Sequence, residues 1–304
     1  MNRIAKITTF ALTALLSYLA ILVATPYLAI NHINTLPFAK VTTAQHQTFG
    51  PSQNVVLHMA KRELPITITP GLIPGSLTIN AHNIEYKSGP IAKLFTKQDY
   101  HLKSDSIAVY LSTPPLSIIS DYFNNSPTQP SNIQFKMKNF QSLKSKKSSI
   151  GLITARLNVN EPLSLFIHAE QITPPTEIPF TNHTLEPLQQ ALATTDHIDI
   201  HATLASVKPN TYTLKTEMKT KSLDGSENKD YLYVEDIKPH LGPQLHKLQI
   251  NKQSLTILTL QPFSKLSAQI NSKVGRLITQ LILSPFIDLE IENALTIESH
   301  NSKS

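Results

Sequence analysis

One spacing of apolar residues recurs along this 304-residue chain and restricts the folds that it can adopt. Apolar or small residues stand at positions i, i+2, i+4 and i+7, as in residues 77–84 (LTINAHNI) and 165–172 (LFIHAEQI). The first three positions share one face of a β-strand, but i+7 falls on the opposite face of an uninterrupted strand. A β-bulge before the last position returns it to the first face, so each copy predicts a bulged strand with one apolar side.

Three copies of this pattern supply the candidate ligand-binding residues of the chain. We expect the following residues on the apolar face: Leu77, Ile79, Ala81, Ile84, Ile133, Phe135, Met137, Phe140, Leu165, Ile167, Ala169 and Ile172. A fourth copy consists of Ile287, Leu289, Ile291 and Ala294, and a looser fifth consists of Tyr100, Leu102, Ser104 and Ile107. The opposite face is mostly polar, with Thr78, Asn80 and His82 in one copy and Phe166, His168 and Glu170 in another.

Repeated bulges curl a sheet, so the copies together predict a curved sheet with one wet and one dry face. The ordinary interpretation is that the dry face packs against a second sheet or against helices. The alternative is that part of the dry face is a groove that binds acyl chains.

Alternation of apolar and polar residues predicts β-structure over most of the chain after residue 52. The expected strands are residues 54–59, 66–69, 76–86, 100–111, 132–140, 149–159, 163–172, 197–204, 211–221, 230–235, 247–259 and 287–298. The expected helices are residues 116–123, 184–194 and 271–282, and residues 224–228 (DGSEN) predict a hairpin tip. Prolines cluster between the strands, where they mark turns and edges.

Residues 7–30 form an uncharged, predominantly apolar segment that is long enough to cross a bilayer. Arg3 and Lys6 precede it, so the positive-inside rule predicts a single pass with a cytoplasmic N-terminus. A cleaved signal peptide is the competing interpretation, but Tyr18 and Leu22 stand where cleavage usually needs small residues. We therefore expect a membrane anchor at residues 1–30, a polar tether at 31–52 and one β-rich domain at 53–304.

The distribution of charge argues against nucleic-acid binding, although the net charge is +6. Five basic residues precede Glu63, the first acidic residue, and the rest of the chain carries 22 basic and 21 acidic residues. Nucleic-acid binding needs a concentrated basic face. The densest local group is typical of a solvated strand edge: Lys136, Lys138, Lys144, Lys146 and Lys147. The absence of cysteine excludes disulfides and thiolate metal sites.

Residues 196–201 (DHIDIH) come nearest to a metal-binding motif. On a strand His197, Asp199 and His201 share a face, but residues four apart on a strand are separated by about 13 Å, too far for one ion. The sequence contains no G-x-S-x-G or H-E-x-x-H motif, and its carboxylates show no pairing that predicts catalysis. We therefore expect a protein that is not an enzyme and has no metal site and no cofactor; an anchored hydrolase is the least favoured alternative.

The N-terminal apolar segment followed by strands that end in L-x-I-x-A-x-x-I resembles an uncharacterised single-anchor periplasmic family of Gram-negative bacteria, a domain of unknown function that is distantly AsmA-like. Residues 163–204 carry most of the likeness, as a strand, a proline loop, a short helix and another strand. The AsmA-like group implies long curved β-sheets with an apolar groove, and roles in phospholipid movement or envelope maintenance. The uncharacterised family implies no activity and no site residues. The chain departs from such proteins because it has no Trp and only 8 Gly.

These observations predict a mainly β protein in which a transmembrane helix precedes an elongated, curved, mostly antiparallel sheet, a half-barrel or open sandwich with two or three short helices. Its expected location is the bacterial inner membrane, with the bulk of the chain in the periplasm. Its expected function is lipid binding or transfer, or envelope maintenance, with phospholipid or envelope proteins as partners. The alternative is a scaffold for protein interactions that is tethered to the inner membrane.

Overall fold

The computed structural model is mainly β and divides into two compact units, residues 1–84 with 104–137 and residues 85–103 with 138–304. The prediction of a mainly β, mostly antiparallel fold is confirmed, and the sheet is open. The structure describes residues 15, 17–19, 24–31, 33–34, 39–43, 51–59, 62–73, 75–87, 101–113, 130–142, 149–160, 162–173, 192–239, 241–283 and 295–299.

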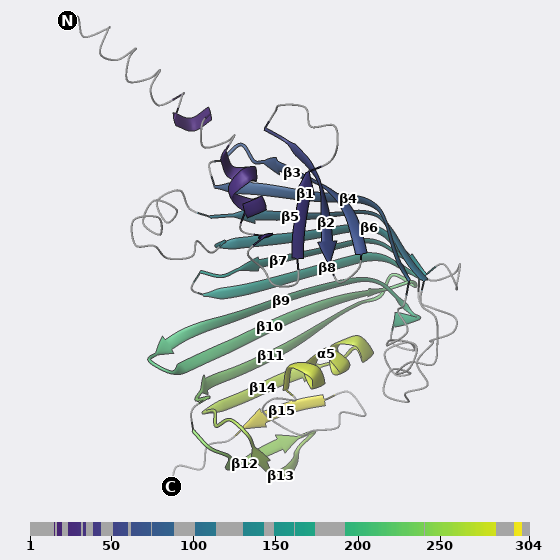
Figure 1. The fold of residues 1–304 in the computed structure, drawn as a ribbon. Helices are drawn as coiled ribbons and strands as arrows, with labels where there is room; N and C mark the ends of the chain where they lie inside the picture. Colours follow the sequence, from purple (N-terminus) through teal and green to yellow (C-terminus); the bar gives the residue numbers. More distant parts are fainter. Residues whose placement is uncertain are drawn as a thin grey trace, which may run out of the picture. The chain divides into compact units, whose positions relative to one another are not determined.

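The first unit is built on a run of strands that pair in chain order (Figure 1). These strands are β1 (Ala39–Thr43), β2 (Gln53–Met59), β3 (Arg62–Pro70), most of β4 (Ser76–Lys87), most of β5 (His101–Ser112) and the first half of β6 (Asn132–Ser142). Neighbouring strands from β1 to β4 are antiparallel, with Val41 opposite Leu57 and Ile66 opposite Ala81. β1 falls within the segment for which the sequence predicts a polar tether.

The core of the first unit lies on one face of β1 to β4, where alternate residues are apolar. It consists of Val41, Val55, Ile66, Ile68, Leu77 and Ala81, with Ile79 and Ile84 packed against them. Residues 24–31 are helical, and Ala29 and Ile30 of this segment also contact the cluster. Among the residues that the structure describes, no helix is both long enough and apolar enough to cross a membrane.

In the second unit the strands up to β11 pair in chain order, whereas the last four short strands do not (Figure 1). Its elements are β7 (Ser149–Asn158), β8 (Leu163–Thr173), β9 (Thr195–Lys208), β10 (Thr211–Ser222), β11 (Glu227–Ile237), β12 (Gln244–Ile250), β13 (Gln253–Thr259), β14 (Lys265–Ile270), α5 (Lys273–Leu283) and β15 (Leu295–Ser299). Neighbouring strands follow the order β7-β8-β9-β10-β11-β14-β15-β12-β13. β15 joins the last hairpin to the sheet, because Ile297 lies opposite both Ala268 of β14 and Ile250 of β12.

Helix α5 confirms the expected helix at residues 271–282, and its start is fixed by a buried carboxylate. Ser272 precedes the helix and its hydroxyl accepts a hydrogen bond from the Gly275 amide at 2.8 Å. Asp230 of β11 is fully buried and accepts hydrogen bonds from the Asn271 amide, the Ser272 amide and the Ser272 hydroxyl. A Cβ at Gly275 would stand 2.5 Å from the Asp230 Cγ, so only glycine fits beneath this cap. Asp230 therefore holds α5 against the sheet.

In the repeated pattern, the residue at position i+6 has the left-handed backbone conformation, with a positive φ angle. Asn83, Asn139 and Gln171 occupy this position in the first three copies, and their φ angles are 50°, 49° and 56°. Asn tolerates this conformation better than most residues with a side chain. The following residue returns to the apolar face, since Ile84 and Ile172 pack with the apolar residues earlier in their own copies.

The predicted extra residue of a bulge is not present between β7 and β8. Ile150 stays opposite Ile172, and Leu152 stays opposite Glu170, so the register does not shift across the left-handed Gln171. Gly151 stands opposite Gln171 and leaves room for its side chain. The prediction that position i+7 shares the apolar face is right for this copy. The cause is not an extra residue: at Gln171 and the opposite Gly151, both strands exchange the faces on which their side chains lie.

Two details of the predicted strands are wrong. Residues 247–259 form the hairpin β12–β13 rather than one strand, because Asn251 and Lys252 both have positive φ and turn the chain. β14 was not expected. The expected helix at 116–123, most of the one at 184–194 and the start of the strand at 287–298 lie outside the described residues, as does the fourth copy of the pattern.

Candidate functional site

Strands β7, β8 and β9 of the second unit separate an apolar face from a polar face. Alternate residues of β8 point to opposite sides, and the register carries this division to both neighbouring strands. The apolar rungs across the three strands are Leu157–Leu165–Ala202, Ala155–Ile167–Ile200 and Ile153–Ala169–Ile198. On the polar side, His168 lies opposite Asp199 and Glu170 lies opposite His197. Two candidate sites therefore share the same strands.

Helix α5 covers one end of the apolar face. Val274 of the helix is buried with Ile172 and Ile198, and Leu277 and Ile278 pack against this cluster. In the described part of the second unit, the recorded packing on this face extends as far as Ile200. The two rungs that contain Leu165 and Ile167 are half-buried, although every neighbour in each rung is apolar.

The structure divides the expected apolar residues between the two units. Leu77 and Ala81 are buried in the core of the first unit, with Ile79 and Ile84 packed against it. Ile172 is buried under α5 with Ala169 beside it, while Leu165 and Ile167 are half-buried farther along β8. The remaining four are half-buried on β6: Ile133, Phe135, Met137 and Phe140. The first copy is thus core, and the copy on β8 is the one that extends beyond its covering helix.

The polar face holds a compact group of imidazoles and carboxylates, which we call the His168–His197 cluster: His168, Glu170, His197 and Asp199. Asp199 accepts hydrogen bonds from both rings, at 2.7 Å from His168 Nδ1 and 3.0 Å from His197 Nε2. The Glu170 carboxylate lies 3.6 Å from His168 Nε2. The two rings meet edge to face, with centroids 4.6 Å apart. All four side chains are partly shielded from solvent, and 21% of His168 is exposed.

Asp199 is the electrostatic centre of this cluster. Burial alone raises the pKa of its carboxyl, but hydrogen bonds from His168 and His197 and their positive charge outweigh burial, so the pKa lies below the usual value of 3.8. Asp199 is therefore ionised at neutral pH. An ionised carboxylate between two imidazoles fixes the orientation of both rings.

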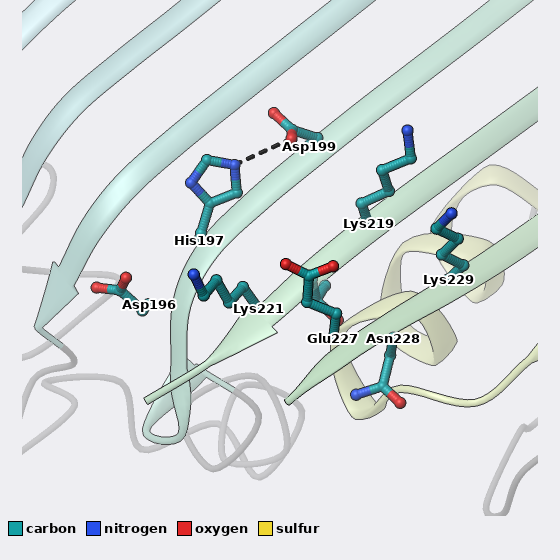
Figure 2. Close-up of a pocket in the computed structure, with 9 residues that line it drawn as sticks. Asp196, His197, Asp199, Lys219, Lys221, Glu227, Asn228 and Lys229 are labelled. Atoms are coloured by element: carbon teal, nitrogen blue, oxygen red, sulfur yellow. Dashed lines mark hydrogen bonds and ion pairs between the residues drawn. The ribbon is translucent and has the colours of Figure 1, made fainter. Parts of the chain in front are cut away.

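A shallow depression of about 310 Å³ opens beside His197 and Asp199 (Figure 2). Its lining comes from β9, β10 and β11 and consists of Asp196, His197, Asp199, Lys219, Thr220, Lys221, Glu227, Asn228 and Lys229. The ammonium of Lys219 lies 3.2 Å from Glu217, and this contact raises the pKa of the lysine. Charged and polar side chains therefore line the whole depression.

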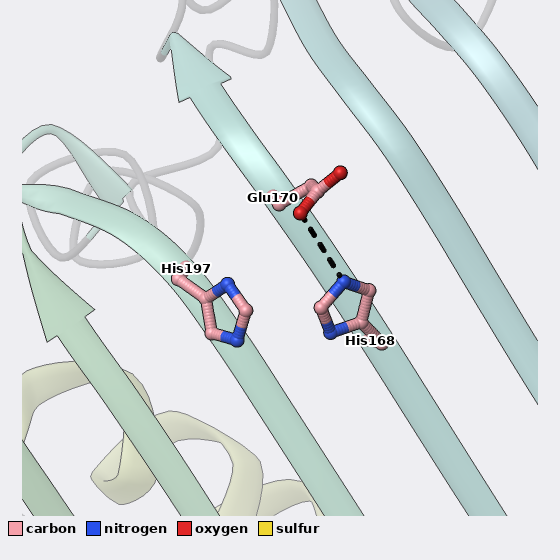
Figure 3. Close-up of side chains that lie close together, drawn as sticks. All are labelled: His168, Glu170 and His197. Carbon is pink, nitrogen blue, oxygen red and sulfur yellow. Dashed lines mark ion pairs between the residues drawn. The ribbon is translucent and has the colours of Figure 1, made fainter.

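Sequence reasoning argued against one ion bound by His197, Asp199 and His201, and the structure places His201 opposite Phe166, outside the cluster. It missed His168 and Glu170, which β8 brings to His197 from a neighbouring strand (Figure 3). A signal was available, because H-x-E and H-x-D occur in consecutive expected strands. Asp230 was also missed. Leu232, Val234 and Ile237 stand at positions i+2, i+4 and i+7 of a further copy of the pattern, but its first position, which is usually apolar, is the carboxylate of Asp230.

Comparison with protein-family models, with curated proteins and with solved structures gives no match to this chain. The site is therefore interpreted from its own geometry.

Proposed function

We propose that this protein is a membrane-anchored, non-catalytic β-protein of the bacterial envelope that binds the acyl chains of a lipid on the apolar face of β7, β8 and β9. The observation that carries the proposal is the pair of half-buried apolar rungs that contain Leu165 and Ile167, next to the rung that α5 covers. These two rungs, two residues apart, extend roughly 7 Å along the strands, at about 3.3 Å per residue. Each buried methylene contributes roughly 0.8 kcal/mol, so an acyl segment of about five methylenes along these rungs gains about 4 kcal/mol before ordering costs.

Exposed apolar side chains in the first unit support attachment to a membrane. In the helical residues near the N-terminus, 53% of Leu15 and 63% of Leu28 are exposed. Leu72 and Ile73, in the turn after β3, are 88% and 64% exposed. The Tyr18 hydroxyl donates a hydrogen bond to the Leu72 carbonyl, which brings this turn beside the helical residues. Large exposed apolar side chains that gather on one surface are typical of membrane or protein contact sites. They agree with the uncharged segment at residues 7–30 and with the resemblance to periplasmic single-anchor proteins.

The test uses two neighbouring residues of β8 that lie on opposite faces. A photo-crosslinking benzophenone amino acid is placed at Ile167, on the apolar face, or at Phe166, on the polar face, of the full chain. The protein is expressed in a Gram-negative bacterium, the cells are irradiated, and the adducts are identified by mass spectrometry. We expect a lipid adduct at position 167 and none at position 166.

Other outcomes refute the proposal. Equal lipid adducts at both positions would mean non-specific contact with the bilayer, and absence of a lipid adduct at 167 would remove the binding face. A protein adduct confined to 167 would favour the alternative, a scaffold that binds another envelope protein through this face.

A further inference from the structure

The polar face of β8 and β9 carries metal-ligating groups that acyl-chain binding does not use. His168, Glu170 and His197 each offer one ligand atom, and these atoms all lie within 4.8 Å of one another (Figure 3). Two strands supply them: His168 and Glu170 are two residues apart on β8, and His197 is directly opposite Glu170 on β9. The antiparallel register therefore assembles the group.

The spacing of the three ligand atoms fits one small cation. Three atoms within 4.8 Å of one another all lie no farther than about 2.8 Å (4.8 Å divided by √3) from a common point. Zinc–nitrogen and zinc–oxygen bonds measure about 2.0–2.2 Å, so each atom needs to close by less than about 1 Å. Side-chain rotation is sufficient for this movement, since all three residues are only partly buried. Two imidazoles and a carboxylate are a common zinc ligand set.

Asp199 supplies the outer contact that zinc-binding histidines usually have. It holds Nδ1 of His168 and Nε2 of His197, which leaves the second nitrogen of each ring to bind metal. The remaining nitrogen of His168, Nε2, is the one that faces the Glu170 carboxylate at 3.6 Å. One carboxylate thus orients both imidazoles while staying outside the ligand set.

From this arrangement we infer that the protein binds one divalent transition-metal ion of the zinc type through His168, Glu170 and His197, with Asp199 as the positioning residue. Three protein ligands leave the fourth position of a tetrahedral ion open to water or to an exogenous ligand. The depression lined by Lys219, Lys221 and Lys229 includes His197, so solvent reaches the site. The inference is independent of the proposed acyl-chain binding, because it concerns the opposite face of the strands.

The experiment is a zinc titration of the full chain after treatment with a chelator, in competition with a chromophoric zinc chelator. Cobalt(II) absorption provides a second readout that reports tetrahedral coordination. We expect one equivalent to bind, and His197→Ala or Glu170→Gln to weaken binding at least tenfold. Asp199→Asn should weaken it by about 10–100-fold, as loss of an outer-shell partner does.

His201→Ala is the matched control, since His201 lies on the same strand and the same face, opposite Phe166 and outside the cluster. This variant should bind zinc as the unmodified chain does. Circular dichroism of each variant checks that the sheet has folded, and the isosteric Glu170→Gln keeps the test valid where a histidine variant does not fold. Absence of stoichiometric binding in the folded full chain, or an equal loss in His201→Ala, would overturn the inference.

Discussion

Substitutions at Gly151 and Gln171 test whether close contact between β7 and β8 at this point requires glycine opposite the left-handed Gln171. A Cβ built on Gly151 would stand 2.9 Å from the Gln171 Cβ and 3.0 Å from its Cδ. Rotation of the glutamine moves its far end but not its Cβ, so Gly151→Ala forces a backbone shift. Overpacking of this kind costs about 1–3 kcal/mol. Gln171→Gly alone should change stability by less than about 1 kcal/mol, because relief of the left-handed strain offsets the added chain entropy.

The double variant isolates this contact. Gln171→Gly removes all three atoms that lie nearest to the new Cβ, so in that background Gly151→Ala should cost little, and the two changes should couple by about 1–3 kcal/mol. The assay is urea unfolding of the full chain, followed by far-ultraviolet circular dichroism because the chain has no Trp. Effects that add to within about 0.5 kcal/mol would refute the steric reasoning.

Three further predictions concern single side chains. Asn83→Val should lower the unfolding free energy by about 1–2 kcal/mol and Asn83→Gly by far less, since only the valine strains the left-handed position; equal urea midpoints would contradict this. Asp230→Ala should cost about 3 kcal/mol in the same assay and Ser272→Ala about 1 kcal/mol, because Asp230 accepts the larger number of buried hydrogen bonds. Burial lowers the pKa of His246 from 6.5, so the unfolded chain takes up a proton more readily as the pH falls below 6.5. The unfolding free energy should therefore reach its highest value above pH 6.5 and decrease as the pH falls below 6.5. Urea titrations at pH 5 to 8 measure this decrease, which should be smaller in the His246→Gln variant.

The apolar spacing predicted the strands well because it reports a local property, the face on which each side chain lies. Even the interruption before i+7 was visible, and three copies place a left-handed Asn or Gln there. The looser fifth copy has Ser106 at this position, and no positive φ is recorded for it. A further copy on β11 was overlooked, because its first position is Asp230, although Asp236 has the expected φ of 54°. A polar residue inside an apolar pattern marks a partner elsewhere in the chain, here the start of α5.

The His168–His197 cluster could not be predicted in full from one strand at a time. Residues 197–201 alone are too extended on a strand to surround one ion. The missing ligands come from β8, and the register decides which of its side chains meet His197. A shift of one residue would place Ala169 or Gln171 opposite His197 instead. Register depends on the whole sheet and on the loop between β8 and β9. The sequence alone therefore identifies candidate ligands on each strand, but not which of them contact one another across the strands.

The left-handed conformation of Gln171 determines which neighbouring side chains lie on the face of each proposed site. In an uninterrupted strand Ile172 would lie on the same face as His168 and Glu170, and the apolar face would end at Ala169. The reversal instead places Ile172 under α5, where it is buried with Ile198 and Val274. Glu170 consequently stays on the polar face as the last side chain of β8 opposite β9, across from His197. One backbone conformation therefore lengthens the apolar face and keeps an isoleucine away from the His168–His197 cluster, which is a physical reason for the i+7 spacing on this strand.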